Sequence, residues 1–246
     1  MDRETQPQVP EGYYSGPRSE LQAHVPEVVR RVLDVGCGTG AFGHALKQRG
    51  TPDGIAPTEV IGIELNEAAA REAGAQLDGV LVGDVEAMDL PFEAGRFDCI
   101  VFADLLEHLY DPVAVLRKAA RILDPHGVMV MSIPNVRCHR VLEMLVAGRW
   151  KYEESGILDR THIRFFTAVE MRNMVRAAGL RVLKMQPLAI DAPESFPRNA
   201  DGSVVLRSLC LTPRNDRDYL DLLTFQYVVV AGLPRRGSAC PEEDGP

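Results

Sequence analysis

The sequence predicts an α/β protein with a parallel sheet and helices on both faces. Apolar, strand-like runs alternate with helix-like segments from residue 31 onwards. The run FDCIVFAD (97–104) is almost entirely apolar, as expected of a strand that is buried on both faces. Ligands of such sheets bind beyond the carboxyl ends of the strands, so residues that follow the strands are the candidates for function.

Composition favours one soluble globular domain. The chain has 246 residues, of which 46% are hydrophobic and 25% charged, with a formal net charge of −8. This charge argues against nucleic acid as a partner, and no apolar run reaches the roughly 18 residues of a membrane span. The five cysteines form no CxxC pair, and with no signal peptide in view we expect reduced thiols and a cytoplasmic location; they are Cys37, Cys99, Cys138, Cys210 and Cys240.

Four segments in the first half have the length and composition of strands: residues 31–35, 60–65, 80–84 and 97–104. Residues 1–30 are expected to form a loose segment and a short helix, with apolar side chains at Leu21, Val25, Val28 and Val29. A second helix is expected after Thr39 and up to Gly50, with one face made by Ala41, Phe42, Ala45 and Leu46. Asn66 suits the N-cap of a third helix.

The second half continues the alternation. Asp111 and Pro112 predict a helix start, and the expected buried stripe is Val113, Leu116, Ala120 and Leu123. A fifth strand is expected over 128–134, and Thr167 with Glu170 predicts a capping box for a helix over 167–179. Strands are then expected over 180–190 and 222–233, separated by a long excursion over 191–218.

We therefore expect a single domain, in which three consecutive regions follow the N-terminal segment. Residues 31–134 form the ligand-binding core, and residues 135–233 supply insertions and the last two strands. Residues 234–246 are expected to be a disordered tail.

The glycines that follow the first strand fit two classes of ligand. In RVLDVGCGTG (31–40), Gly36 and Gly38 together with Ala41 satisfy the G-x-G-x-x-G/A pattern of dinucleotide-binding proteins. Asp34 argues against a dinucleotide, because a carboxylate beside a pyrophosphate is repelled in a partly dry cleft. S-adenosylmethionine carries an ammonium and a sulfonium and no phosphate. We therefore expect S-adenosylmethionine, and a nicotinamide-dependent oxidoreductase is the alternative.

Two further acids suit this cofactor. Glu64 ends the second strand, where a carboxylate accepts hydrogen bonds from both ribose hydroxyls. Asp84 ends the third strand, within reach of the adenine amino group. The segment GDVE (83–86) is otherwise an ordinary turn between strand and helix.

Several of these segments together resemble the class I S-adenosylmethionine-dependent methyltransferases. They are DVGCGTG, IGIEL, GDVEAMDLPFEAGRFDCIVFADLLEHL and ARILDPHGVMVMSIPN, over about residues 30–135. The resemblance implies a single-domain, Rossmann-like sheet of seven strands whose last strand is antiparallel and lies between the fifth and sixth. It also implies that the cofactor is contacted by Asp34, Gly36, Cys37, Gly38, Gly40, Glu64, Leu65, Asp84, Val85, Ala103, Asp104 and Leu105.

The second half resembles a narrower group. GRWKYEESGILDRTHIRFFTAVEM (148–171) is similar to a bacterial subset that acts mostly on small metabolites and on glycan or natural-product intermediates. Tyr14 and Arg18 resemble an N-terminal feature of that subset which closes over the cofactor, although Tyr13 offers a second register.

Two histidines are the candidate catalytic bases, because a neutral hydroxyl acceptor needs help to lose its proton. His108 lies in DLLEHL just past the fourth strand, and His162 lies in DRTHIRFF. The alternatives are a helix-start residue bonded to a backbone carbonyl and a solvated basic loop.

Four residues are expected to contact the acceptor: Asn135, Trp150, Arg160 and Arg164. The two arginines suit an anionic group on the acceptor. Trp150 suits either stacking on a ring or packing of the insertion onto the sheet.

The pattern Asp104-x-x-Glu107-His108 resembles the acid-x-x-Glu-His motif of ubiquinone-type O-methyltransferases, some of which use a divalent ion. Asp stands here where that group usually has Glu, and acids are common at helix starts. We therefore expect no metal.

Taken together, these patterns predict a methyltransferase that most resembles O-methyltransferases of small molecules, with the acceptor pocket walled by residues 135–166 and 191–218. N-methylation of a small amine, a nicotinamide oxidoreductase and a catalytically silent cofactor-binding module remain the alternatives. The expected partner is a small-molecule acceptor, with no nucleic acid and no membrane. Residues 191–218 suit either a lid over the site or an arm that contacts a second copy of the chain, so a homodimer is one of the two expectations.

Overall fold

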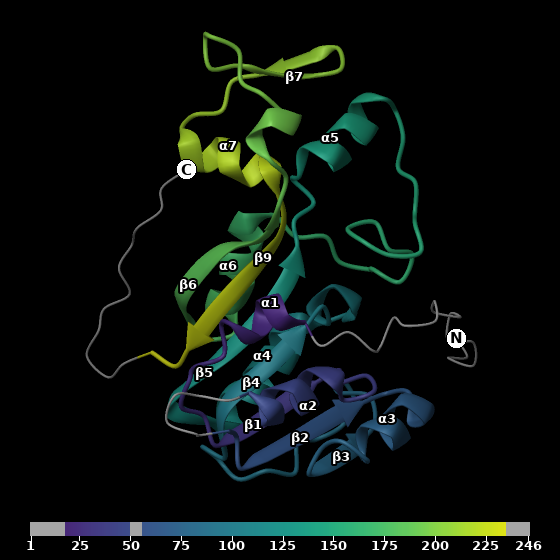
Figure 1. Cartoon of the computed structure of the whole chain (residues 1–246), viewed down its shortest axis with the longest axis vertical. Coiled ribbons are helices and arrows are strands. Elements are labelled where there is room, and N and C mark those ends of the chain that lie inside the picture. The colour runs from purple at the N-terminus through teal and green to yellow at the C-terminus, as the bar shows by residue number, and fades with distance from the viewer. Residues whose placement is uncertain (1–17, 50–55, 235–246) are drawn as a thin grey trace.

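The structure, a computed structural model, describes residues 18–49 and 56–234. Its centre is a seven-stranded sheet of order β3-β2-β1-β4-β5-β9-β6 (Figure 1). The strands are β1 (Arg31–Val35), β2 (Glu59–Glu64), β3 (Gly79–Val82), β4 (Phe97–Ala103), β5 (Leu123–Pro134), β6 (Arg181–Ile190) and β9 (Thr224–Gly232). β9 runs antiparallel to both of its neighbours, β5 and β6. The predicted sheet and the predicted place of its last strand are confirmed.

Helices cover both faces of this sheet. The helices α1 (Ser19–Gln22), α2 (Ala41–Gln48) and α3 (Glu67–Ala73) contribute to one hydrophobic cluster, and α4 (Pro112–Ile122) and α6 (Ala168–Ala177) contribute to the other. A third group lies beyond the carboxyl end of β5 (Figure 1): α5 (His139–Val146), α7 (Asp216–Leu223) and the small hairpin of β7 (Val204–Leu206) and β8 (Leu209–Leu211). Within the described residues, no helix has the length and hydropathy needed to cross a bilayer.

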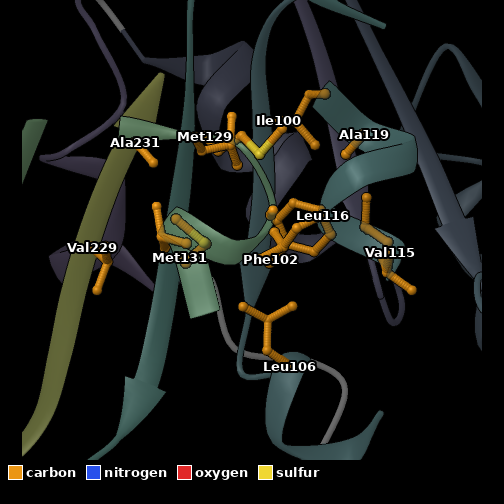
Figure 2. Close-up of a cluster of buried hydrophobic side chains, with 14 of the residues drawn as sticks. Ile100, Phe102, Leu106, Val115, Leu116, Ala119, Met129, Met131, Val229 and Ala231 are labelled. Carbon is orange, nitrogen blue, oxygen red and sulfur yellow. The ribbon is translucent and has the colours of Figure 1, made fainter. Parts of the chain in front are cut away.

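The two clusters arise because successive residues of a strand point to opposite faces. In β4, Ile100 and Phe102 belong to the cluster under α4, whereas Cys99 and Val101 belong to the cluster under α2. Figure 2 shows the first cluster, with Leu116 of α4 against the side chains of β4 and β5. A strand buried on both faces is therefore apolar at every position, as the sequence pattern predicted.

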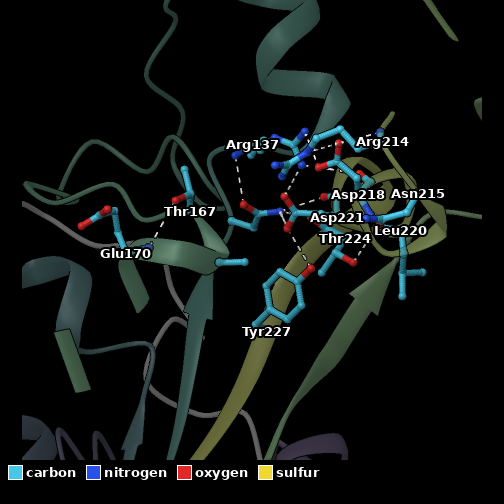
Figure 3. A network of polar contacts seen from close by, with 12 residues as sticks. Arg137, Thr167, Glu170, Arg214, Asn215, Asp218, Leu220, Asp221, Thr224 and Tyr227 are labelled. Atoms are coloured by element: carbon cyan, nitrogen blue, oxygen red, sulfur yellow. Dashed lines mark hydrogen bonds and ion pairs between the residues drawn. The ribbon is translucent and has the colours of Figure 1, made fainter. Parts of the chain in front are cut away.

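The predicted helix starts are confirmed by their caps. The Asn66 side chain accepts hydrogen bonds from the backbone amides of Ala68 and Ala69 at 2.9 and 3.0 Å. The Asp111 carboxylate accepts one from the Ala114 amide at 2.9 Å. The Thr167 hydroxyl accepts one from the Glu170 amide at 3.4 Å (Figure 3). Short polar side chains that satisfy first-turn amides fix where these helices begin.

Some expectations for helices are wrong. The first helix ends at Gln22, so Val25 and Val29 are buried from a loop and Val28 is 63% exposed. The buried residues of α4 are Pro112, Val115, Leu116, Ala119 and Ile122, which shifts the predicted stripe by about a third of a turn. Leu123 already belongs to β5.

The sequence analysis did not predict α5, α7 or the β7–β8 hairpin. A small hydrophobic cluster joins residues 191–218 to α7: Phe196, Val204 and Leu206 pack with Tyr219 of that helix. The expectations for the tail over 235–246 and for Tyr14 lie outside the described residues.

Candidate functional site

A cavity of about 950 Å³ lies at the carboxyl edge of the sheet. The ends of β1, β2 and β4, residues 83–86 after β3, and the start of β9 line it, and a loop over residues 155–163 closes one side. Its volume is at the upper end of the range for ligand pockets, so it is large enough for a cofactor-sized ligand together with a second small molecule.

Most of the predicted site residues line this cavity: Arg18, Asp34, Gly36, Cys37, Gly38, Glu64, Leu65, Asp84, Val85, Ala103, Asp104, Leu105, His108, Arg160 and His162. Gly40, Asn135, Trp150 and Arg164 are not among its lining residues. Phe225 and Gln226 line it without having been predicted, because β9 reaches it only through the sheet topology.

The glycine loop and the acid that ends β2 form one hydrogen-bonded unit. Glu64 accepts hydrogen bonds from the Gly38 amide at 2.9 Å and from the Asn66 amide at 2.8 Å. The amides of Gly36 and Cys37 both donate to the Ile63 carbonyl, at 2.8 and 3.1 Å. Charge-assisted bonds to backbone amides hold this carboxylate in place, and its remaining lone pairs are available to a ligand.

Asp34 lies at the floor of the cavity with one oxygen unsatisfied. The residue is 1% exposed, and its Oδ2 has no hydrogen-bond partner. Burial raises the pKa of Asp34 to about 7, and the negative charge of Glu64 adds to this effect. A buried carboxylate without a partner is costly, and a ligand with a positive end relieves that cost.

Two of the loop glycines are required by backbone conformation. Gly36 and Gly38 have φ values of +75° and +56°, in the left-handed region that favours glycine. A Cβ on Gly36 would also come within 3.1 Å of Leu105, which lines the same cavity. The loop therefore brings bare backbone to the position that a ligand occupies.

Gly40 packs between the start of α2 and α3. Its φ is +84°, and a Cβ there would lie 3.0 Å from the Cα of Ala73 in α3. This packing alone requires a glycine, and the expected contact of Gly40 with a cofactor stays a prediction.

Asp104 connects the end of β4 with the N-terminal segment. Its Oδ1 accepts hydrogen bonds from the Ser132 hydroxyl and from the Gln226 amide, each at 2.5 Å. Its other oxygen forms an ion pair with Arg18. Asp104 has a φ of +50°, a left-handed conformation that these contacts hold in place.

Asp84 sits in the turn after β3. Its Oδ1 accepts a hydrogen bond from the Glu86 amide at 2.9 Å, so one carboxylate oxygen shapes the turn while the residue lines the cavity. The position agrees with the one expected for the third acid of the cofactor site.

Two histidines and a glutamate meet where the segment after β4 faces the loop over residues 155–163. The rings of His108 and His162 lie edge to face, with centroids 4.7 Å apart. The Nε2 atom of His162 is 3.8 Å from the Oε1 atom of Glu107. Glu107 and His108 are neighbours in one sequence motif, and the fold brings His162 to them from more than fifty residues away.

Burial governs the charge of this group. It lowers the pKa of His108 to about 4 and also lowers the pKa of His162, in the first case with help from the other ring. Glu107 is 1% exposed, neither of its oxygens has a hydrogen-bond partner, and burial raises its pKa to about 8. Both rings are therefore neutral at pH 7, and the Glu107 carboxyl lacks any bound donor.

These three residues fit a divalent cation. Their ligand atoms lie within 4.8 Å of one another, and two imidazoles with one carboxylate form a known donor set for such ions. The unsatisfied Glu107 oxygens supply the structural sign that a donor or cation belongs there. This geometry reopens the metal alternative that the sequence analysis set aside.

A second group of metal-type side chains, Cys138, His139 and Asp191, has a structural explanation. Asp191 is held by Arg140, which pairs with both of its oxygens, and His139 Nε2 lies 3.0 Å from the same carboxylate. The His139 ring stacks on Phe196 with centroids 4.4 Å apart. These contacts tie α5 to the end of β6.

Asn135, predicted to contact an acceptor, lies in a buried polar network and not in the cavity lining. The residue is 0% exposed, and its amide donates to the Asp221 and Thr224 carbonyls at 2.9 and 3.0 Å. It belongs to a polar network with Arg137, Asp221 and Tyr227 that joins α7 to β5 and β9 (Figure 3). Its role is to satisfy buried backbone groups.

The remaining acceptor candidates differ in position. Trp150 packs edge to face on Phe165, with centroids 5.1 Å apart, and so takes the packing alternative. Arg164 donates to the Tyr110 carbonyl at 2.6 Å and lies outside the cavity. Arg160 lines the cavity and pairs with Glu154.

Comparison with known proteins gives three results. A family model described as a methyltransferase domain matches residues 11–185. Proteins named ubiquinone biosynthesis O-methyltransferase are similar: the one from Neisseria meningitidis serogroup A is 29% identical over 66% of this chain and 68% of its own length. The one from Acinetobacter baylyi is 25% identical over 65% of this chain and 66% of its own length. The chain thus spans about two thirds of these relatives.

Solved structures with a similar fold include a SAM-dependent methyltransferase from Archaeoglobus fulgidus, with a TM-score of 0.59 and 17% identity over 82% of this chain and 85% of that one. A Thermotoga maritima protein described as a possible histamine N-methyltransferase has a TM-score of 0.57 and 22% identity, with 89% of each chain covered. At these identities the likeness concerns the fold.

Proposed function

The chain belongs to the class I S-adenosylmethionine-dependent methyltransferases, the family whose domain model it matches over most of its length, and from that premise we propose that it methylates a hydroxyl group of a small-molecule acceptor. Its similarity to ubiquinone biosynthesis O-methyltransferases supports transfer to oxygen. One observation carries the proposal: a single cavity is lined both by the acids suited to a cationic cofactor and by the neutral histidine pair.

The residues at the cofactor end fit S-adenosylmethionine, which supplies an electrophilic methyl group on a sulfonium when bound. Asp34 presents an unsatisfied carboxylate oxygen to a positive group, and Glu64 presents lone pairs to ribose hydroxyls. The backbone of the left-handed glycines allows close approach. The same acids disfavour a pyrophosphate, which is the reason to set aside the nicotinamide alternative.

The residues at the acceptor end are suited to taking a proton. The Nδ1 atom of His162 lies 2.9 Å from the Ile157 carbonyl, and that of His108 lies 3.2 Å from the Thr161 carbonyl. A carbonyl only accepts, so each Nδ1 carries the hydrogen and each Nε2 keeps its lone pair. A hydroxyl bound against Nε2 can give its proton to that atom while its oxygen bonds to the methyl carbon and the bond from that carbon to the sulfonium sulfur breaks.

A divalent cation is the specific alternative to a histidine base. Glu107, His108 and His162 would hold it, and it would lower the pKa of an acceptor hydroxyl. In that case the histidines serve as ligands through the same Nε2 atoms.

The proposal is tested with isotope-labelled S-adenosylmethionine and a panel of small phenols, sugars, hydroxy acids and amines, in the presence of Mg²⁺ and of a chelator. Methylation of a hydroxylated member, lost in His108→Ala and His162→Ala, supports the proposal. Activity that survives the chelator favours the base, and activity lost with the chelator favours the cation. Methylation of amines alone, unaffected by either histidine substitution, would overturn transfer to oxygen.

A further inference from the structure

We propose that Asp159 and Thr161 form a positioning relay that fixes the tautomer and the ring orientation of His108. The two residues lie in the loop between α5 and α6, far in sequence from η1 (Leu106–His108), the short 3₁₀ helix that carries the histidine. The chemical task of His108 rests on the proposed function, but the relay itself is a property of the protein without ligands.

The first step of the relay is a carboxylate with two donors from one residue. Asp159 is 3% exposed, and its Oδ1 lies 2.8 Å from the Thr161 amide and 2.6 Å from the Thr161 hydroxyl. A carboxylate oxygen only accepts, so the single hydroxyl hydrogen of Thr161 points to Asp159. The hydroxyl oxygen is thereby left as an acceptor.

The second step uses that acceptor. The Nδ1 atom of His108 lies 3.1 Å from the Thr161 hydroxyl oxygen and 3.2 Å from the Thr161 carbonyl oxygen. Both oxygens accept, so Nδ1 must carry a hydrogen, and the lone pair of the neutral ring is on Nε2. In the other tautomer, the Nδ1 lone pair would face two oxygens and be repelled by both.

The loop that contains the relay is itself held against η1. The amides of Ile163 and Arg164 both donate to the Glu107 carbonyl, each at 3.0 Å. The Asp159 amide donates to the Gly156 carbonyl at 3.1 Å, and the Asp159 carbonyl accepts from the His162 amide at 3.0 Å. The position of Thr161 relative to His108 is therefore fixed from both sides.

This arrangement is what a histidine needs whether it acts as a base or as a ligand. Both tasks require the lone pair on Nε2, and both depend on the partner of the opposite nitrogen. Because the Thr161 hydroxyl donates its hydrogen to the buried Asp159 carboxylate, it presents only an acceptor oxygen to the His108 ring. We therefore assign Asp159 and Thr161 as positioning residues of His108.

The direct test is the ¹⁵N nuclear magnetic resonance signature of the His108 ring in the full chain without ligands. The wild type is expected to show a protonated Nδ1 and an unprotonated Nε2. Thr161→Val keeps the Thr161 carbonyl, 3.2 Å from Nδ1, and removes only the hydroxyl acceptor, so it is expected to add a minor population of the opposite tautomer to the wild-type one. Thr161→Ser is expected to restore the wild-type signature. The reverse tautomer in the wild type, or an unchanged signature in Thr161→Val, would overturn the relay.

A kinetic split provides the second readout. Thr161→Val is expected to lower kcat roughly 10- to 100-fold, the scale for loss of a partner that orients a histidine, with KM for S-adenosylmethionine nearly unchanged. Thr161→Ser should recover most of kcat, and Asp159→Ala should resemble Thr161→Val. The control is Thr58→Val, which removes an exposed hydroxyl that donates to the Arg30 carbonyl and lies outside the cavity lining.

The outcomes separate the relay from the proposed function. The expected tautomer in a protein that methylates no hydroxyl would leave the relay standing and overturn the proposed function. A kcat that falls equally in Thr161→Val and Thr161→Ser, with both variants folded by thermal unfolding, would contradict the relay even in an active methyltransferase.

Discussion

The Glu64 carboxylate accepts a hydrogen bond from the Gly38 backbone amide at 2.9 Å, so the acid at the end of β2 and the glycine loop after β1 are one unit. Glu64 holds Asn66 through its other oxygen at 2.8 Å. A ligand that reaches Glu64 therefore meets a loop whose shape is already set, and little ordering remains to be done on binding.

Glu64→Ala is expected to lower the affinity for S-adenosylhomocysteine by about 100-fold, because two charge-assisted bonds to the loop and the contact to the ribose are lost together. Calorimetric titration measures it. Glu67→Ala is the matched control, since Glu67 forms an exposed ion pair with Arg71. An affinity within twofold of the wild type in Glu64→Ala would contradict the assignment.

Asp34→Asn is expected to change how stability depends on pH. The Asp34 pKa is raised from 3.8 to about 7, so between these values the folded protein keeps a proton that the unfolded chain has lost. Stability of the unliganded wild type therefore falls as pH rises through this window and levels off above it. The variant should gain stability relative to wild type over the same window, by at most about 4 kcal/mol.

Chemical denaturation at pH 4, 5.5 and 7.5 measures that difference. Asp98→Asn should behave in the opposite way, because hydrogen bonds from the Arg30 and Arg31 amides help to lower the pKa of Asp98. Its stabilising contribution is present above the unfolded pKa and is lost as pH falls. If the difference in free energy of unfolding between Asp34→Asn and the wild type stays constant with pH, titration of the buried Asp34 carboxylate is not its cause.

Gly40→Ala is expected to destabilise the fold by roughly 2 kcal/mol, because the added Cβ would combine a left-handed backbone with contact to the Ala73 backbone. Gly148→Ala has a similar φ of +69° but open space around the Cβ, so it isolates the backbone cost. Thermal unfolding should show the larger loss in Gly40→Ala. Equal losses would mean that packing against α3 contributes nothing.

Binding of a divalent cation at Glu107, His108 and His162 is expected to raise the melting temperature as the ion concentration increases, because an ion that binds only the folded state stabilises it. Glu107→Gln should abolish this shift. Titration with Mg²⁺, Mn²⁺ and Zn²⁺ measures it, with Asp191→Asn as the control for the second group, Cys138, His139 and Asp191. No shift with any ion at millimolar concentration would leave the histidine base as the mechanism.

Asn135→Ala is expected to lower the free energy of unfolding by about 2 kcal/mol, because it leaves the buried Asp221 and Thr224 carbonyls without their donor. The KM values for cofactor and acceptor should stay near those of the wild type. Denaturation and steady-state kinetics measure the two effects. A raised acceptor KM with unchanged stability would restore the role that the sequence first suggested.

The cofactor end of the site was predictable because its information is local. Asp34, Gly36 and Gly38 follow one strand, and Glu64 ends the next, so parallel pairing alone brings them to one edge. The local pattern did not show the packing of Gly40, because Ala73 of α3 approaches it from more than thirty residues away in the chain.

The acceptor end was predictable only as a list of candidates. His108 and His162 were both named, but nothing in the sequence placed Glu107 between them or showed that Thr161 contacts the first ring. Arg164 and Trp150 lie close to these residues in sequence and yet point elsewhere. An irregular loop has no helical or strand repeat of apolar residues, so the sequence does not indicate which of its side chains face inward.

The sequence by itself determined the strands, the three capped helix starts and the positions of the predicted cofactor acids at the ends of strands, because strand burial, N-caps and glycine turns depend on residues near one another in the chain. The tertiary structure alone decided that Asn135 bonds to Asp221 and Thr224, and that Gln226 reaches Asp104. These partners are roughly a hundred residues apart. Their contacts exist only because β9 inserts between β5 and β6, and the packing of the whole sheet sets that geometry.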